Sequence, residues 1–169
     1  MKKDLSGFYI RNAKFWGLSK SKPFIASMKK THKIQNKILR IIMNGIIDGS
    51  IKKVDKFRIY FTDKPPNTSD GEWVEDKQVG KCYSLTLAKF NDTIRDVFGT
   101  DKYKSICRCM TQYVVERVLS YLKRNKKKNG SCRIPRIRIH ESKSYYFKDA
   151  FVSVDMEKQT LTFDTINGK

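Results

Sequence analysis

Residues 103–122 read YKSICRCMTQYVVERVLSYL and carry the strongest periodic pattern in the chain. Apolar side chains recur there at intervals of three and four residues, which is the spacing of one face of an α-helix. They are Tyr103, Ile106, Cys107, Met110, Tyr113, Val114, Val118, Tyr121 and Leu122. The pattern predicts a long helix that begins near Thr100, a residue suited to cap it, and ends in a basic run before Asn129 and Gly130.

Two further helices are predicted upstream of this one. Ser19 and Pro23 give a typical helix start, and apolar residues then follow at helical spacing as far as Gly49. The opposite face of this predicted helix carries the cations Lys29, Lys30, Lys33, Lys37 and Arg40. A shorter apolar repeat predicts a second helix over residues 84–98.

Strands are predicted where apolar and polar residues alternate with a period of two. They cover residues 5–18, 54–62, 133–139, 145–147, 151–155 and 160–165, and the last two pair as a hairpin. Pro135 places the strand at 133–139 on the edge of a sheet. Residues 63–76, with two adjacent prolines and an Asp-Gly pair, are predicted to form a loop.

These elements predict an α+β fold. In it a helical bundle, residues 19–130, is inserted into a small antiparallel β-barrel or sheet built from residues 1–18 and 131–169. The sequence ends just after Asn167 and Gly168, a dipeptide typical of hairpin turns, and no returning strand follows it. We therefore expect a chain that is truncated at its C-terminus.

Composition excludes several classes of protein. The 169 residues include 36 Lys and Arg against 17 Asp and Glu, a formal net charge of +19. A hydrophobic fraction of 39% and an aromatic fraction of 12% are too high for a disordered polycation. No apolar run is long enough for a membrane span, and the first residues lack the apolar block of a signal peptide. We expect a folded cytoplasmic protein with reduced cysteines and no membrane partner.

The positive charge is concentrated in two blocks. Residues 1–40 contain eleven basic residues and one acid, and residues 101–140 contain twelve basic residues and two acids. Residues 41–100 contain nine of each and are neutral. Clustered Lys and Arg side chains release condensed counterions from phosphates, so this segregation favours a polyanion partner, and we expect nucleic acid.

The predicted binding site centres on the second basic block. Cations close the predicted third helix and continue along the strand that follows, where arginine can bind phosphate through two hydrogen bonds. The candidate nucleic-acid contacts are Lys30, Lys33, Lys37, Lys123, Arg124, Lys126, Lys127, Lys128, Arg133, Arg136, Arg138 and Tyr145. The alternative is structural: cations favoured at a helix C-terminus, and a charged edge strand that resists aggregation.

The sequence contains no catalytic motif that we recognise. It lacks the phosphate-binding loop of NTPases, the dinucleotide-binding glycine motif and the nucleophile elbow of hydrolases. Cys107 and Cys109 lie two residues apart in a helical pattern and point in different directions, which does not suit zinc. We expect no catalytic residue, no metal ion and no cofactor.

The C-terminal part of the chain also resembles a known family. The residues concerned are 113–118 (YVVERV), 132–136 (CRIPR), 150–155 (AFVSVD) and 160–169 (TLTFDTINGK). Together they resemble the amino-terminal part of TnpB-type transposon nucleases and type V CRISPR effectors. In that family a β-rich wedge domain is interrupted by a helical recognition domain, an order similar to the one predicted here.

The resemblance implies a function in RNA-guided DNA cleavage. It implies that the chain holds guide RNA and the duplex of guide with target DNA through backbone contacts. The matching basic residues would contact RNA; they are Arg124, Lys126, Lys127, Arg133, Arg136 and Arg138. The family's RuvC-like nuclease domain and zinc-binding cysteine pairs are missing here. We therefore expect no cleavage by this chain alone, and a nuclease portion on the same or a separate chain.

Two other functions are compatible with the same charge. A free-standing DNA-binding regulator would read base edges with a helix, and the turn at 98–100 before the third helix is the one place for it. A small protein that inhibits or assists a nuclease would instead bind a protein partner without RNA.

Overall fold

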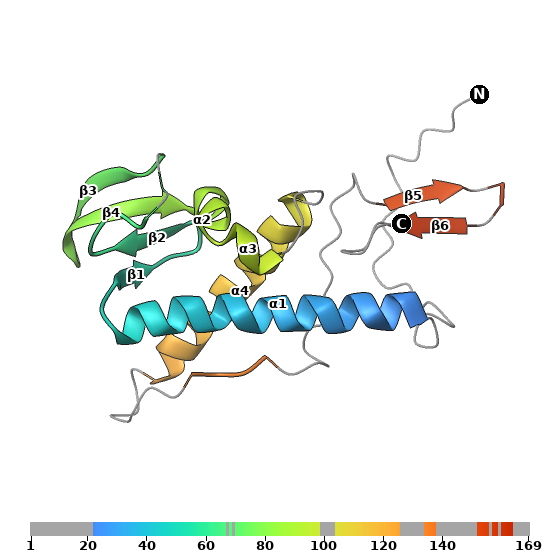
Figure 1. Cartoon of the computed structure of the whole chain (residues 1–169), viewed down its shortest axis with the longest axis horizontal. Coiled ribbons are helices and arrows are strands. Elements are labelled where there is room, and N and C mark those ends of the chain that lie inside the picture. Colours follow the sequence, from blue (N-terminus) through green and yellow to red (C-terminus); the bar gives the residue numbers. More distant parts are fainter. Residues whose placement is uncertain are drawn as a thin grey trace.

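The computed structural model of the chain describes residues 22–66, 68, 70–98, 104–125, 134–137, 152–155, 157–158 and 160–163. Helices and strands both occur in this part of the chain, so the predicted α+β class is confirmed (Figure 1). The helices are α1 (Lys22–Ile47), α2 (Leu87–Thr93), α3 (Arg95–Phe98) and α4 (Lys104–Asn125). The strands are β1 (Ile51–Val54), β2 (Arg58–Phe61), β3 (Glu72–Asp76), β4 (Gly80–Thr86), β5 (Val152–Asp155) and β6 (Thr160–Phe163).

Strands β1 to β4 form an antiparallel sheet in the order β1-β2-β4-β3. The sheet is open, with β1 and β3 at its edges, so the described strands form a sheet and not a barrel. One face carries Ile59, Phe61, Tyr83 and Leu85, all buried in the main hydrophobic core. Strands β5 and β6 pair separately as the predicted hairpin.

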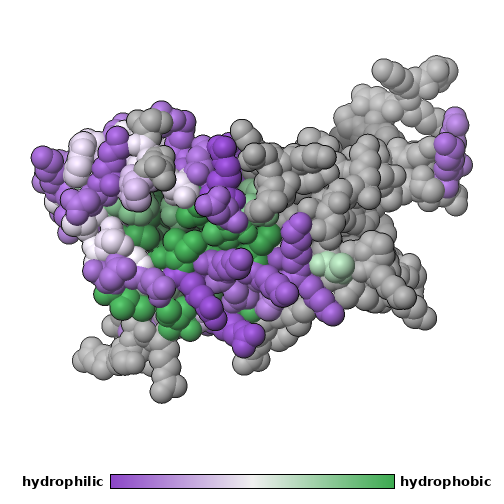
Figure 2. Space-filling model, viewed as in Figure 1, coloured by the Kyte–Doolittle hydropathy of each residue, from purple (hydrophilic) through white to green (hydrophobic). Residues whose placement is uncertain are grey.

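Helices α1 and α4 provide the other half of the core. They cross each other below the sheet in Figure 1, and side chains from both are completely buried where they meet. The fully buried residues are Ile38, Ile42 and Met43 of α1 and Val114, Val115 and Val118 of α4. Figure 2 shows hydrophobic residues between the hydrophilic surfaces of the sheet and of α1. Both long helices were predicted. The ends predicted for α4, near Thr100 and just before Asn129, lie outside the described residues.

The sequence was less informative between residues 50 and 100. The predicted strand 54–62 is wrong as a single strand, because Asp55 accepts hydrogen bonds from the backbone N–H groups of Phe57 and Arg58 and closes a turn there. The predicted loop 63–76 ends in β3, and the helix predicted to start at Ser84 begins only after β4. The whole four-stranded sheet therefore lies inside the segment 19–130 that was predicted to be helical.

The C-terminal predictions have mixed outcomes. Residues 134–137, predicted as an edge strand, pair with no strand in the described part of the chain. The predicted strands at 5–18 and 145–147 lie outside the described residues.

Gly45 lets strand β1 approach helix α1 closely. Gly45 is buried in the last turns of α1, and a Cβ atom added to it would lie 2.6 Å from Cδ1 of Ile51. Real Cβ atoms are not found so close to another carbon, so a side chain at this position would force the buried side chain of Ile51 to move.

The substitution Gly45→Ala should therefore destabilise the protein. Overpacking costs about 1–3 kcal/mol, and the better helix propensity of alanine returns about 1 kcal/mol, so we expect a net loss of about 1 kcal/mol in urea unfolding. The control is Asn44→Ala, at an exposed position one residue earlier. Equal stability of the two variants would contradict this account.

Candidate nucleic-acid interface

An extended segment of four residues is bound along α1. We call residues 134–137 the strap; it is the orange segment below α1 in Figure 1. Asn36 holds it through both polar groups of its side chain. Its Nδ2 donates to the carbonyl oxygen of Ile137 at 3.1 Å, and its Oδ1 accepts from the Ile137 N–H at 3.1 Å. The side chain of Asn36 therefore pairs with Ile137 as a neighbouring strand would.

His32 makes a third polar contact with the same residue. Its Nε2 lies 2.8 Å from the carbonyl oxygen of Ile137. A carbonyl oxygen only accepts, so Nε2 carries a hydrogen and donates it. The side chain of Ile137 is 3% exposed and belongs to the main hydrophobic core. Burial of the Ile137 side chain and hydrogen bonding of its backbone together fix the end of the strap on α1.

A groove of about 500 Å³ lies between α1 and the strap. Its lining residues are His32, Lys33, Asn36, Lys37, Arg40, Ile134, Pro135 and Arg136. Four of them are cations and none is acidic. Lys33, Lys37, Arg40 and Arg136 are all exposed, and none has an ion-pair partner among the described residues. The groove is therefore a concave site of uncompensated positive charge.

The groove brings together residues from the two basic blocks of the sequence. Lys33, Lys37 and Arg136, all predicted nucleic-acid contacts, line it together, although Lys37 and Arg136 are 99 residues apart in the chain. Lys30 lies on α1 and is half-buried, but it does not line the groove.

The other predicted contacts lie elsewhere. Lys123 and Arg124 are exposed in the last turn of α4, where Arg124 donates to Ser120 Oγ at 3.0 Å, and neither lines the groove. The remaining candidates lie outside the described residues; they are Lys126, Lys127, Lys128, Arg133, Arg138 and Tyr145.

Five residues that line the groove were not among the predicted contacts: His32, Asn36, Arg40, Ile134 and Pro135. Arg40 lies on the cationic face of α1, and extending the spacing of Lys33 and Lys37 by one turn would have found it. His32 and Asn36 form hydrogen bonds with Ile137 of the strap, which lies 101 or more residues away in the sequence. No local sequence pattern therefore identifies them.

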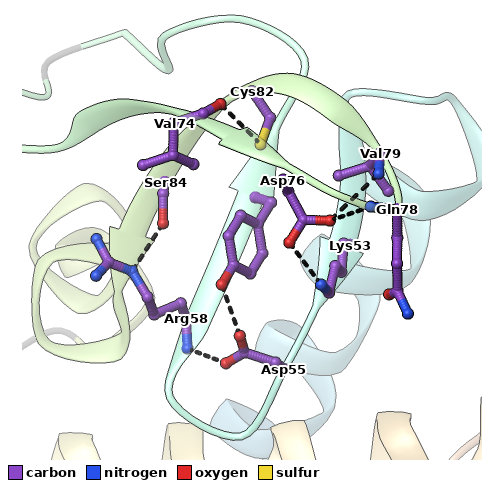
Figure 3. Close-up of polar contacts among 10 residues, drawn as sticks. Lys53, Asp55, Arg58, Val74, Asp76, Gln78, Val79, Cys82 and Ser84 are labelled. Atoms are coloured by element: carbon purple, nitrogen blue, oxygen red, sulfur yellow. Dashed lines mark hydrogen bonds and ion pairs between the residues drawn. The ribbon is translucent and has the colours of Figure 1, made fainter.

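The sheet differs from the groove because it has acidic as well as basic side chains, and some of them are paired (Figure 3). Lys53 forms an ion pair with Asp76 at 2.7 Å, and Arg58 pairs with Glu72 and donates to Ser84 Oγ. Tyr60 donates its hydroxyl hydrogen to Asp55 at 2.8 Å. Burial and this hydrogen bond raise the pKa of Tyr60 to about 12. The ion pair of Lys53 with Asp76 links the two edge strands, β1 and β3, whereas Arg58 of β2 donates to Ser84 of the neighbouring strand β4.

The described residues contain no cluster of three or more His, Cys, Asp or Glu side chains suited to a metal ion. Within the same part of the chain, no helix combines the length and apolar character needed to cross a membrane.

Neither a protein-family model nor a curated protein or solved structure matches this chain. The resemblance to TnpB-type nucleases and type V CRISPR effectors stays a prediction.

The role of Asn36 can be tested through the amide of Ile137. In Asn36→Ala the N–H of Ile137 loses its acceptor, and leaving such a group unsatisfied costs about 1–3 kcal/mol. We expect the protection of this amide against hydrogen exchange, measured by NMR, to fall well below that of the wild-type protein. Asn44→Ala, on an exposed turn of the same helix, should leave it unchanged. Unchanged protection in Asn36→Ala would mean that the strap is held without this side chain.

The ion pair on the sheet predicts a dependence of stability on pH. Hydrogen bonds from Lys53 and from the Gln78 backbone hold the pKa of Asp76 below its usual range. A carboxyl whose pKa is lower in the folded state stabilises the protein above its unfolded pKa, and loses this effect as pH falls through the folded value. Asp76→Asn should therefore have a lower urea midpoint than the wild-type protein at neutral pH. The two midpoints should become equal near about pH 2.

The matched control for Asp76 is Asp63→Asn, an exposed carboxylate with no ion pair among the described residues. It should change the midpoint little at either pH. A difference between wild type and Asp76→Asn that persists in acid would contradict the electrostatic explanation.

Proposed function

We propose that this chain binds nucleic acid and that the groove between α1 and the strap holds the phosphate backbone. The observation that carries the proposal is the convergence of four uncompensated cations from two distant parts of the sequence. Gathering like charges without counter-charges costs free energy, and a bound polyanion removes that cost. Phosphates are the anionic groups that Lys and Arg bind through charge-assisted hydrogen bonds in such sites.

A membrane surface is a weaker candidate for the polyanion. A helix that binds a bilayer through its surface inserts an apolar face beside its cations. The apolar stripe of α1, including Ile34, Ile38 and Ile42, is buried in the protein core. Among the described residues of α1, those exposed on the opposite side include Lys29, Lys33, Lys37 and Arg40, which favours a ligand bound through its charge.

We further propose that the nucleic acid is a guide RNA and its duplex with target DNA, and that the chain is the non-catalytic binding portion of an RNA-guided nuclease. The support for this finer proposal is the resemblance of residues 113–118, 132–136 and 150–169 to that family. Contacts to phosphates alone suit such a role, because guide pairing supplies the sequence specificity.

The alternative of a DNA-binding regulator has less support. It requires a recognition helix after the turn at residues 98–100, and one face of the following helix, α4, is in the core. Seven of its side chains are buried, and four of these are completely inaccessible to solvent: Thr111, Val114, Val115 and Val118.

The salt dependence of binding tests the groove. Each phosphate contact contributes about 0.7 to the slope of log affinity against log salt on single strands and about 0.9 on duplex. The double variant Lys33→Ala/Lys37→Ala should therefore make the slope shallower by about 1.4 on single-stranded RNA. Fluorescence anisotropy of a labelled strand across a salt series measures it.

The matched control is Lys64→Ala/Lys77→Ala, which removes the same charge from two exposed positions near the sheet. It should change the slope much less. Equal slopes in the two variants would show that binding depends on net charge and not on the groove. Structured RNA, unrelated RNA of equal length and random duplex should be compared in the same series. Tighter binding to structured RNA at moderate salt supports the guide-holding role, and equal binding to all three argues against it.

A further inference from the structure

The two walls of the groove have different chemistry. The wall formed by α1 presents Lys33, Lys37 and Arg40, whereas the strap presents Ile134 and Pro135 beside Arg136. Ile134 remains 40% exposed at this site, although the strap is fixed in place by Ile137. A site for phosphates alone gains nothing from an exposed apolar wall, so the ligand has an apolar part as well as a charged one.

The cations on α1 follow a line along the helix axis. Lys33 and Lys37 are about 6 Å apart along the axis, and Arg40 lies about 4.5 Å further, from the rise of 1.5 Å per residue. Such a line can contact neighbouring phosphates of one strand, while Arg136 contributes a charge from the opposite wall.

We infer that the groove binds single-stranded nucleic acid, with one unpaired base against Ile134 and Pro135 and the flanking phosphates on Lys33, Lys37, Arg40 and Arg136. This inference rests on the proposed function and narrows the class of ligand from nucleic acid to single strands. The groove has a volume of about 500 Å³, which is typical of a site for one small molecule and suits a nucleotide. A duplex keeps its bases stacked inside and presents a convex backbone, so its bases cannot reach the apolar wall.

Two polar side chains that line the groove are used to hold the strap. Asn36 donates to the carbonyl oxygens of His32 and Ile137 and accepts from the Ile137 N–H, and His32 Nε2 donates to Ile137. The base therefore meets the apolar side chains of Ile134 and Pro135 beside the cations of the groove.

The test compares four labelled ligands of equal length with the full chain: single-stranded RNA, single-stranded DNA, the same DNA strand with abasic nucleotides, and duplex DNA. The abasic strand keeps every phosphate but has no bases. We expect it to bind about fivefold more weakly than the intact strand, the lower limit found for loss of base stacking. We also expect this ratio to persist as salt is raised, because the base contact releases no counterions. Duplex should also bind more weakly than the intact strand.

A variant pair locates the base contact. Ile134→Ser should weaken binding of the intact strand about fivefold and leave binding of the abasic strand unchanged. Ile47→Ser is the matched control, since Ile47 is a similarly exposed isoleucine, 54% accessible, at the end of α1 and outside the groove lining. It should bind both strands as the wild type does.

The outcomes separate this inference from the proposed function. Equal binding of intact, abasic and duplex ligands would overturn the single-strand inference and leave phosphate binding in place. An Ile134→Ser variant that weakens intact and abasic strands equally would also overturn it. Failure of every ligand to bind the wild-type chain would overturn both.

Discussion

The packing of α4 against α1 determines which side of α1 is available to a ligand. Ile38, Ile42 and Met43 are fully buried where the two helices meet, so the rotation of α1 about its axis is fixed. With that face in the core, the cations on the opposite face of α1 have to face solvent. The same contact that stabilises the fold therefore also exposes Lys33, Lys37 and Arg40.

The strap completes the site at a considerable cost in chain entropy. Ile137 forms hydrogen bonds with residues that are 101 or more positions away in the sequence. The entropy lost in closing so long a loop is offset by burial of the Ile137 side chain and by three hydrogen bonds. The strap also adds Arg136 to a surface that is already positive. A ligand that binds only this folded arrangement stabilises it by mass action, so the proposed phosphate binding implies that the ligand also stabilises docking of the strap.

Local pattern was enough for α1 and α4 because each is long and has one apolar face. It was not enough for the sheet. Asp55 closes a turn with its carboxylate while the alternation of residue types continues across it, so two strands resembled one. The acidic strand β3 lies at an edge and buries little, so it lacks the alternation of a half-buried strand. The strap looked like a strand because its alternation is real, but its partner is a side chain of α1.

The groove was predictable in composition but not in geometry. Charge segregation alone indicated a polyanion partner and gave Lys33, Lys37 and Arg136 among the contacts. It could not show that these three share one concavity, because that depends on Asn36, a residue with no marked local pattern. The groove and the sheet differ in whether their cations have ion-pair partners. Lys53 and Arg58 are paired with acids, whereas the groove cations have no ion-pair partner in the described part of the chain, so we assign the proposed binding of anions to the groove and not to the net charge.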